Sequence, residues 1–325
     1  MHSIYPWQQQ EWTQLLSRKN SAQLPHAILI KGMEGLGKYH FAQCLAEVLL
    51  CQNGSAQACG ECSACQLLKS NNHPDLIIIQ PEEENKTIKI DQIRELVSEL
   101  NNTSQQGGYK IAIIEHAELL NIAASNALLK TLEEPAVNVI IILISHHLAT
   151  LAATIRSRCQ IITIKTPSFA EAQEWLEQQA PGADFKLALA LAGNAPLKAL
   201  NILKEENLQK RQEFFQNLYA LQNKKMSTVQ IAQQYLDWDF RSLLLTFMRV
   251  VSDLIKIKLT AIENVINQDQ MKELIQLAAK TDLHKLFIYQ KQLLELHQYL
   301  IRNINFNRQL TAENLSLTWA QLFVK

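Results

Sequence analysis

The sequence LIKGMEGLGKYH, residues 29–40, follows the pattern G-x-x-x-x-G-K-[ST] of a phosphate-binding loop up to its last position. In such loops the glycines let backbone amides close around phosphate oxygens, and the lysine reaches the β- and γ-phosphates. An apolar run precedes the stretch and a helical pattern follows it, as the motif requires. The residues that fit the motif, with one additional glycine, are Gly32, Gly35, Gly37 and Lys38.

Tyr39 stands where the motif needs the hydroxyl of Ser or Thr to bind magnesium. A phenol is too long and too rigid to hold the ion beside the β-phosphate. We therefore predict a fold of phosphate-loop ancestry in which ATP binding is weak or absent.

Outward from this loop, residues 25–165 alternate short apolar runs with stretches of helical periodicity, among them 91–100 and 118–134. The runs are almost continuously apolar, which is typical of parallel strands covered on both faces. Pro135 should close the second of these helices. The pattern predicts an α/β domain with a parallel five-stranded sheet, whose strands we expect at 27–30, 76–80, 110–115, 139–145 and 160–164.

The strand pattern stops after Pro167. Three short helical segments follow up to about residue 206, and residues 207–325 contain neither Gly nor Pro and keep a helical spacing. We expect three domains: an α/β domain (1–166), a small helical domain (167–206) and an all-α domain (207–325).

The strand expected at 110–115 ends in Glu115, and His116 follows it. Phosphate-loop enzymes carry a metal-organising Asp and a water-activating acid at such a strand end. His116 could accept a proton as a neutral imidazole, or the two residues could simply end a strand. Because this acid pair is displaced and the hydroxyl at position 39 is missing, we favour a site that has lost hydrolysis. At the end of the next strand we expect Ser145 to satisfy local backbone groups.

Four of the six cysteines lie close together in a C-x7-C-x2-C-x2-C spacing within residues 51–65. Two-residue spacers let neighbouring thiolates face one ion, and four thiolates form the closed tetrahedral shell of structural zinc. Free thiols and an iron–sulfur cluster are the alternatives. We predict a structural Zn²⁺ module inserted in the α/β domain, with the ligands Cys51, Cys59, Cys62 and Cys65.

TIRSRCQIITI places Arg156 and Arg158 just before the last expected strand. An arginine at a domain edge can enter the phosphate site of another subunit and stabilise the charge that develops in phosphoryl transfer. The alternative is a surface arginine in a weak ion pair.

Composition narrows the range of functions. The 325 residues include 31 basic and 31 acidic side chains, so no global positive field indicates nucleic acid. The longest apolar run, 139–144, is too short to cross a bilayer, and the first residues do not resemble a secretory signal. We expect a cytoplasmic protein with no membrane partner and with reduced thiols.

Taken together, SRC (157–159), NALLKTLEEP (126–135), HPD (73–75) and the four-cysteine insertion resemble the bacterial clamp-loader subunits of the AAA+ class. The resemblance is close over residues 1–165 and weaker over 166–205. It implies an AAA+ α/β domain with a zinc module, a small helical lid and a helical collar that oligomerises.

The altered loop makes the chain similar to the non-hydrolysing member of this family rather than to its tau/gamma motors. The resemblance implies that Arg158 completes the ATP site of an adjoining motor subunit and that the four cysteines hold zinc. It also implies a hetero-pentamer with tau/gamma and delta subunits, which acts through the complex on the sliding clamp and on primer-template DNA. Lys198 stands where active relatives carry a phosphate-sensing arginine.

Two other hypotheses stay open. The chain could be an active tau/gamma-like ATPase with an unorthodox magnesium site that uses Glu115 and His116. It could also be a stand-alone zinc-bearing DNA-binding protein, which the zero net charge disfavours.

Overall fold

The computed structural model describes residues 2–54, 56–82, 87–301, 304 and 306–323. The chain forms two compact units. The first contains residues 1–175 and 194–198, and the second contains residues 176–193 and 199–325. The division into three domains at residues 166 and 206 stays a prediction.

The first unit is built on a five-stranded sheet, which confirms the predicted parallel architecture. Every strand pairing is parallel, and the order across the sheet is β2-β3-β4-β1-β5. Because β3 lies beside β4 and β4 lies beside β1, the carboxyl ends of these three strands meet at one edge. The strands are β1 (Ala27–Lys31), β2 (Leu76–Ile79), β3 (Lys110–Ile114), β4 (Val139–Ser145) and β5 (Gln160–Thr163).

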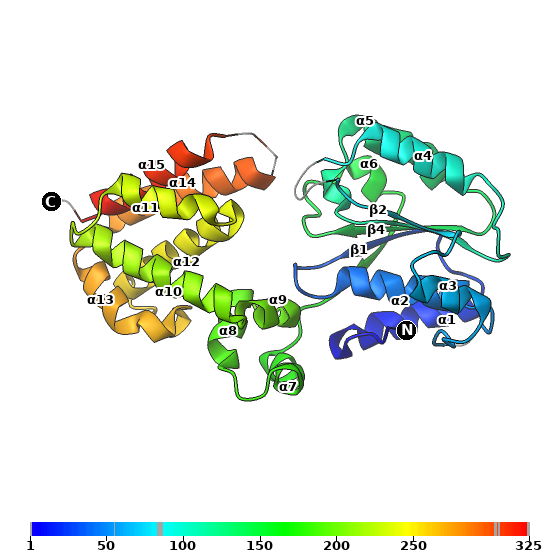
Figure 1. Ribbon diagram of the computed structural model, residues 1–325, viewed down its shortest axis with the longest axis horizontal. Helices are drawn as coiled ribbons and strands as arrows, with labels where there is room; N and C mark the ends of the chain where they lie inside the picture. Colours follow the sequence, from blue (N-terminus) through cyan, green and yellow to red (C-terminus); the bar gives the residue numbers. More distant parts are fainter. Residues whose placement is uncertain (1, 55, 83–86, 302–303, 305, 324–325) are drawn as a thin grey trace. The chain divides into compact units, whose positions relative to one another are not determined.

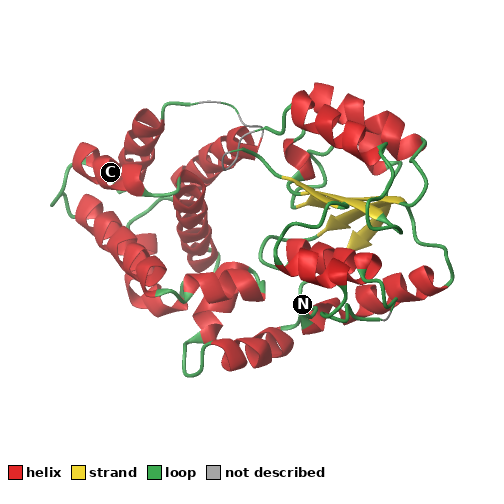
Figure 2. Ribbon diagram, turned by 45° about the vertical axis from the view of Figure 1, so that its right-hand side comes forward, coloured by secondary structure: helices red, strands yellow, loops and turns green. Residues whose placement is uncertain are grey.

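Helices cover both faces of this sheet, as Figures 1 and 2 show. On one face lie α1 (Gln9–Asn20), α2 (Lys38–Leu50) and α3 (Ser63–Lys69), and on the other lie α4 (Ile90–Leu100), α5 (Ile122–Glu133) and α6 (Ala153–Arg156). The central strands β3 and β4 are buried along their whole length, as the continuous apolar runs predicted. The edge strands β2 and β5 are partly exposed, so the expectation of cover on both faces is wrong for them.

The helix expected over 118–134 is divided in two. A short 3-10 turn, Ala117–Leu119, precedes α5, which begins at Ile122. The Asn121 side chain accepts a hydrogen bond from the backbone N–H of Ala124 (2.7 Å), which caps α5 at its start. The helix ends at Glu133, just before Pro135, as predicted.

Two helices contribute residues to both units: α7 (Phe169–Gln179) and α9 (Pro196–Ile202). The rest of the second unit is helical, which confirms the predicted all-α C-terminal region. Its core surrounds α12, whose apolar face buries Phe247 among Phe214, Tyr289 and Trp319. The remaining helices are α8 (Phe185–Ala192), α10 (Glu205–Gln222), α11 (Thr228–Gln234), α12 (Phe240–Lys258), α13 (Met271–Ala279), α14 (Leu283–Ile301) and α15 (Arg308–Gln321).

Within the described part of the chain, no helix combines the length and the apolar character needed to span a membrane.

Candidate functional site

The phosphate-loop sequence connects β1 to α2 at the carboxyl edge of the sheet. Two of its glycines are required by close packing. A Cβ at Gly35 (φ +83°) would lie 2.6 Å from Cβ of Lys198, and one at Gly37 (φ +74°) would lie 2.4 Å from the Tyr5 ring. The loop is therefore packed against the start of α9 and against the N-terminal segment.

The N-terminal segment also holds the loop through hydrogen bonds. Trp7 Nε1 donates to the carbonyl of Leu36 (3.0 Å), and the buried Gln8 side chain donates to the carbonyls of Leu36 (2.8 Å) and Gly37 (3.0 Å). The Tyr5 and Trp7 rings stack with their centroids 4.9 Å apart. Sequence analysis missed these contacts because residues 5–8 carry no motif.

The ammonium of Lys38 is satisfied within its own loop. Its Nζ donates to the carbonyl oxygens of Gly32 and Met33, both at 2.7 Å. Burial lowers the pKa of Lys38 to about 8, although Glu118 and Glu34 act in the opposite direction. In a working loop this ammonium would contact phosphate oxygens.

An ion pair also involves the loop. Lys198 Nζ is 3.0 Å from the Glu34 carboxylate, and the backbone N–H of Leu197 donates to the carbonyl of Gly35 (3.1 Å). Lys198, which we expect at a phosphate-sensing position, is thus paired with a carboxylate of the loop.

Tyr39 is half-buried at the start of α2. Burial raises the pKa of its phenol, and the charge of Glu115 raises it further. The phenol is therefore close enough to the strand-end carboxylate to feel its charge.

A cluster of polar side chains lies where β3 and β4 end. The Glu118 carboxylate accepts a hydrogen bond from the backbone N–H of His146 (3.2 Å) and lies 3.8 Å from His116 Nδ1. The two imidazole rings meet edge to face, with centroids 4.8 Å apart. Sequence analysis singled out Glu115 and His116, whereas Glu118 and His146 were missed.

The charges of this cluster follow from burial and hydrogen bonding. Burial raises the pKa of Glu118, but the hydrogen bond with His116 and backbone donors outweigh it and bring the pKa to about 2. Burial, followed by the charge of Lys38, lowers the pKa of His146 to about 4. At neutral pH Glu118 is an anion and His146 is neutral.

Ser145 is fully buried at the end of β4. Its hydroxyl oxygen has no hydrogen-bond partner among the described residues, so the expectation that it satisfies local backbone groups is wrong.

The four predicted cysteines do come together, between the end of α2 and the start of α3. Their sulfur atoms all lie within 4.8 Å of one another, and Cys59 Sγ is 3.8 Å from Cys65 Sγ. A tetrahedral zinc ion with bonds of ~2.3 Å would hold its sulfurs ~3.8 Å apart. The spacing therefore fits a four-thiolate shell.

Backbone amides around these sulfurs fit the same interpretation. Cys59 Sγ accepts from the N–H groups of Glu61 (3.5 Å) and Cys62 (3.4 Å), and these bonds lower the pKa of Cys59 to about 6. Burial raises the pKa of Cys65 to about 12, so this thiol needs a cation nearby to ionise. The four residues could hold a metal ion.

Arg158 follows α6, just before β5. Its Nε donates to the Glu133 carboxylate at the end of α5 (2.6 Å), Nη2 pairs with the same carboxylate, and Nη1 donates to the carbonyl of Thr154 (2.8 Å). One third of the Arg158 side chain is exposed. It is an accessible arginine held by a single carboxylate.

Arg158 and the phosphate loop lie at opposite ends of the strands, Arg158 at the amino ends and the loop at the carboxyl ends. The loop follows β1, whereas Arg158 precedes β5, which pairs in parallel with β1. β1 has five residues, a length of ~17 Å at ~3.3 Å per residue. Arg158 cannot complete the loop of its own chain.

The sheet order, the loop between β1 and α2 and the helical C-terminal region define the class of protein: a phosphate-loop α/β protein of the AAA+ kind. The family described as DNA polymerase III, delta subunit matches residues 7–168, and its C-terminal counterpart matches residues 187–321. A DNA polymerase III subunit delta' from Pseudomonas aeruginosa is 36% identical, with 99% of each chain covered. The protein of that name from Yersinia pestis is 32% identical over 97% of this chain and 95% of its own. The chain belongs to the DNA polymerase III subunit delta' family.

Among solved structures, a DNA polymerase III gamma subunit-related protein from Thermotoga maritima covers 96% of this chain and 100% of its own. It is 19% identical to this chain, with a TM-score of 0.41.

Proposed function

We propose that this chain is a non-hydrolysing stator subunit of the clamp-loader complex of DNA polymerase III, which places the sliding clamp on primed DNA in the cytoplasm. Its partners are the tau/gamma motor subunits and the delta subunit in a hetero-pentamer. It meets the clamp and primer-template DNA through that complex. Family membership supports the complex, and the residue at position 39 is the observation that carries the non-hydrolysing role.

Two features of the loop support a site without turnover. Tyr39 offers no short hydroxyl for magnesium. Lys198, which lacks the planar fork of arginine, is paired with Glu34.

We further propose that Arg158 acts in trans. Arg158 lies at the amino ends of the strands, away from the phosphate loop of its own chain. The phosphate that it could reach is therefore one bound by a neighbouring subunit. There it would stabilise the negative charge that develops on the transferred phosphoryl group. Reaching that site breaks the pair with Glu133, an exposed ion pair worth ~0–1 kcal/mol.

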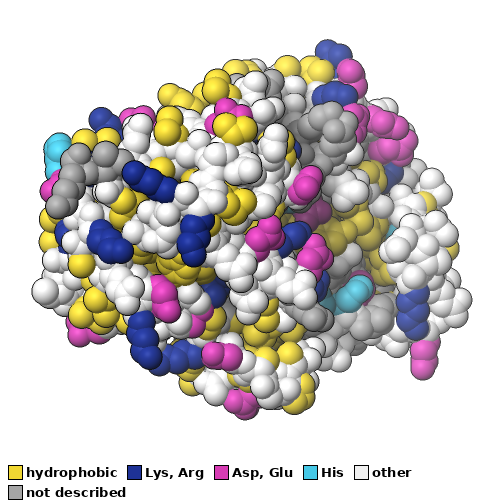
Figure 3. All heavy atoms as spheres, turned by 60° about the vertical axis from the view of Figure 1, so that its left-hand side comes forward, with side chains coloured by type: hydrophobic (Ala, Val, Ile, Leu, Met, Phe, Trp, Pro, Cys, Tyr) yellow, Lys and Arg dark blue, Asp and Glu magenta, His cyan; other side chains and the backbone are white. Residues whose placement is uncertain are grey.

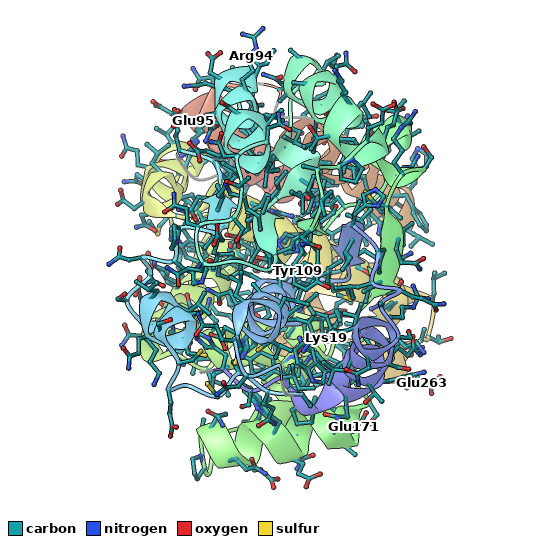
Figure 4. The ribbon with its side chains drawn as sticks, turned by 90° about the vertical axis from the view of Figure 1, so that its right-hand side faces the viewer. Lys19, Arg94, Glu95, Tyr109, Glu171 and Glu263 are labelled. Carbon is teal, nitrogen blue, oxygen red and sulfur yellow. The ribbon has the colours of Figure 1, made fainter. Side chains whose placement is uncertain are left out.

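The test is Arg158→Ala in a loader reconstituted with the motor subunits. Loss of an arginine of this kind lowers turnover at the affected site on the order of 10³-fold. The clamp-dependent ATPase activity of the whole loader should therefore fall by the fraction that this one site contributes, while the complex still assembles. Arg94→Ala is the matched control. Arg94 extends from α4 into solvent (Figure 4) and makes an exposed pair with Asp91. Unchanged turnover in Arg158→Ala would reject the role.

The alternative is an active ATPase that uses Glu115 and His116. It requires magnesium-dependent phosphate release by the isolated chain that disappears in Lys38→Ala. We expect no such release, because Tyr39 offers no short hydroxyl to bind magnesium.

We propose that Cys51, Cys59, Cys62 and Cys65 hold one structural Zn²⁺. The ion would close a tetrahedral shell that joins the end of α2 to the start of α3, and it would lower the pKa of the buried Cys65 thiol by its charge.

DNA contact through the complex, rather than by this chain alone, agrees with its surface. On the face shown in Figure 3, Lys and Arg side chains are interspersed with Asp and Glu side chains. The balanced totals of 31 basic and 31 acidic residues fit the same view.

A further inference from the structure

We propose that His116, Glu118 and His146 bind one divalent transition-metal ion of the Zn²⁺ or Co²⁺ type, at a site separate from the four cysteines. Each of these side chains offers a ligand atom, and the three atoms lie within 4.8 Å of one another. The set is two imidazoles and one carboxylate, which is a recurrent ligand set for zinc with three protein donors.

Unpaired buried atoms point to a ligand at this place. Glu118 Oε2, His146 Nδ1 and Ser145 Oγ are buried, and none of them has a hydrogen-bond partner within the described residues. Buried polar atoms normally have a hydrogen-bond partner. Three unpaired ones close together, just beyond or at the ends of two adjacent strands, indicate that a partner is missing. An ion bound by the first two would supply it.

The geometry needs only a small contraction. Ligands of a tetrahedral ion with bonds of ~2.1 Å lie ~3.4 Å apart. His116 Nδ1 and Glu118 Oε1 are already 3.8 Å apart. Oε1 also accepts a hydrogen bond from the backbone N–H of His146, so the unpaired Oε2 of the same carboxylate is the oxygen left for the ion. Side-chain rotations that move the ligand atoms by on the order of 1 Å would bring all three within bonding distance of one ion. A four-coordinate ion would keep its fourth position for water.

The ligand types select the class of metal. Magnesium prefers an octahedral shell of oxygens, whereas imidazole nitrogen suits Zn²⁺, Co²⁺ and their neighbours. The ligand set at this place therefore fits Zn²⁺ or Co²⁺ better than magnesium.

Charge around the cluster is mixed. The ammonium of Lys38 lies close enough to influence both histidines and opposes a cation, whereas Glu115 and Glu118 favour one. Lys38 acts only through its charge, because its Nζ is bonded to Gly32 and Met33. Removing that charge should strengthen metal binding, an effect that a purely structural cluster would not show.

The test is a titration of the full chain with Co²⁺ after its cysteines have been filled with one equivalent of Zn²⁺. We expect one further equivalent to bind, with visible cobalt absorption and without the sulfur-to-cobalt charge-transfer band of a thiolate site. His146→Ala should abolish this uptake, and Glu118→Gln, which keeps the side-chain shape and an acceptor oxygen, should weaken it at least tenfold. Lys38→Met should tighten it several-fold.

His284→Ala, at an exposed histidine of α14, is the matched control and should bind cobalt as the unchanged chain does. Circular dichroism establishes that each variant is folded. The proposal is overturned if the zinc-filled chain takes up no cobalt, or takes it up only with the sulfur charge-transfer band. It is also overturned if Glu118→Gln, folded, binds as tightly as the unchanged chain.

Discussion

At the scale of single residues, the proposed loss of hydrolysis does not depend on position 39 alone. Glu34 pairs with Lys198, and His116 follows β3 where a catalytic acid pair is expected. Each of these features would persist if a hydroxyl were restored.

Tyr39→Thr should therefore leave the isolated chain without ATPase activity. The new hydroxyl could bind magnesium, but His116 would still stand where a catalytic acid is expected, and Lys198 would still pair with Glu34. Phosphate release measured with Mg-ATP should stay at the level of the unchanged chain, with Lys38→Ala as the control for background. Turnover in Tyr39→Thr that Lys38→Ala removes would show that position 39 was the single defect.

The structural role of Asp75 was not predicted from the sequence. It is fully buried before β2 and accepts hydrogen bonds from the Ser104 hydroxyl and from the backbone N–H groups of Gln105 and Gln106. It thereby fixes the loop that leads into β3. The motif HPD marked the place, but its bonding partners lie about thirty residues away along the chain.

Asp75→Asn should lower the free energy of unfolding by about 2 kcal/mol at pH 7, because an amide NH₂ replaces one acceptor of a buried, charged group. Burial raises the pKa of Asp75, yet the bonds from residues 104–106 lower it overall. Since the folded pKa lies below the unfolded value of ~3.9, this contribution is complete above pH ~4 and is lost as the pH falls through the folded pKa.

Urea denaturation between pH 3 and 7 provides the measurement, and the gap between the two proteins should narrow at the acid end. Asp91→Asn, at an exposed position, should change stability by less than ~0.5 kcal/mol at every pH. A gap that stays constant with pH would contradict the account.

At the scale of elements, the sequence predicted best where one physical cause dominates. β1, β3 and β4 are continuous apolar runs because both faces are buried, and their predicted bounds are close to those observed. The break before α5 was missed because it depends on one side chain, that of Asn121. His146 was missed because only the pairing of β3 with β4 brings it to Glu118.

The cysteine module should stabilise the first unit through its metal. Removing zinc with a chelator, or replacing the buried Cys65 by Ser, should cost one equivalent of zinc and lower the melting temperature, because four thiols that no longer share an ion cannot hold α3 against α2. Cys159→Ala is the control, since Cys159 lies outside the cluster and burial raises the pKa of its thiol to about 11. It should keep the zinc content unchanged. Zinc retained in Cys65→Ser would remove Cys65 from the ligand set.

At the scale of the whole molecule, the two features proposed to act on phosphate lie at opposite ends of the strands of one sheet. The carboxyl edge carries the altered phosphate loop, and the amino edge carries Arg158. Sequence motifs identified both, but strand direction was needed to show that they cannot serve the same phosphate. Which subunit contacts each end of the sheet depends on the assembled complex. No local pattern in a single sequence encodes these contacts.

Glu133 provides a sharper test of this division than Arg158 alone. If Glu133 only holds Arg158 while no neighbour is engaged, Glu133→Gln removes a pair worth ~0–1 kcal/mol, and the ATPase of the reconstituted loader should stay equal or rise by less than about fivefold. If Glu133 instead positions the arginine for catalysis, the same variant should reduce turnover toward the level of Arg158→Ala. The double variant should match Arg158→Ala in either case, because without the guanidinium the carboxylate has nothing to hold. The ATPase turnover of these three loaders, measured at equal extents of assembly, therefore distinguishes two roles of Glu133. Either it only binds Arg158 before a neighbour is engaged, or it orients the arginine for catalysis.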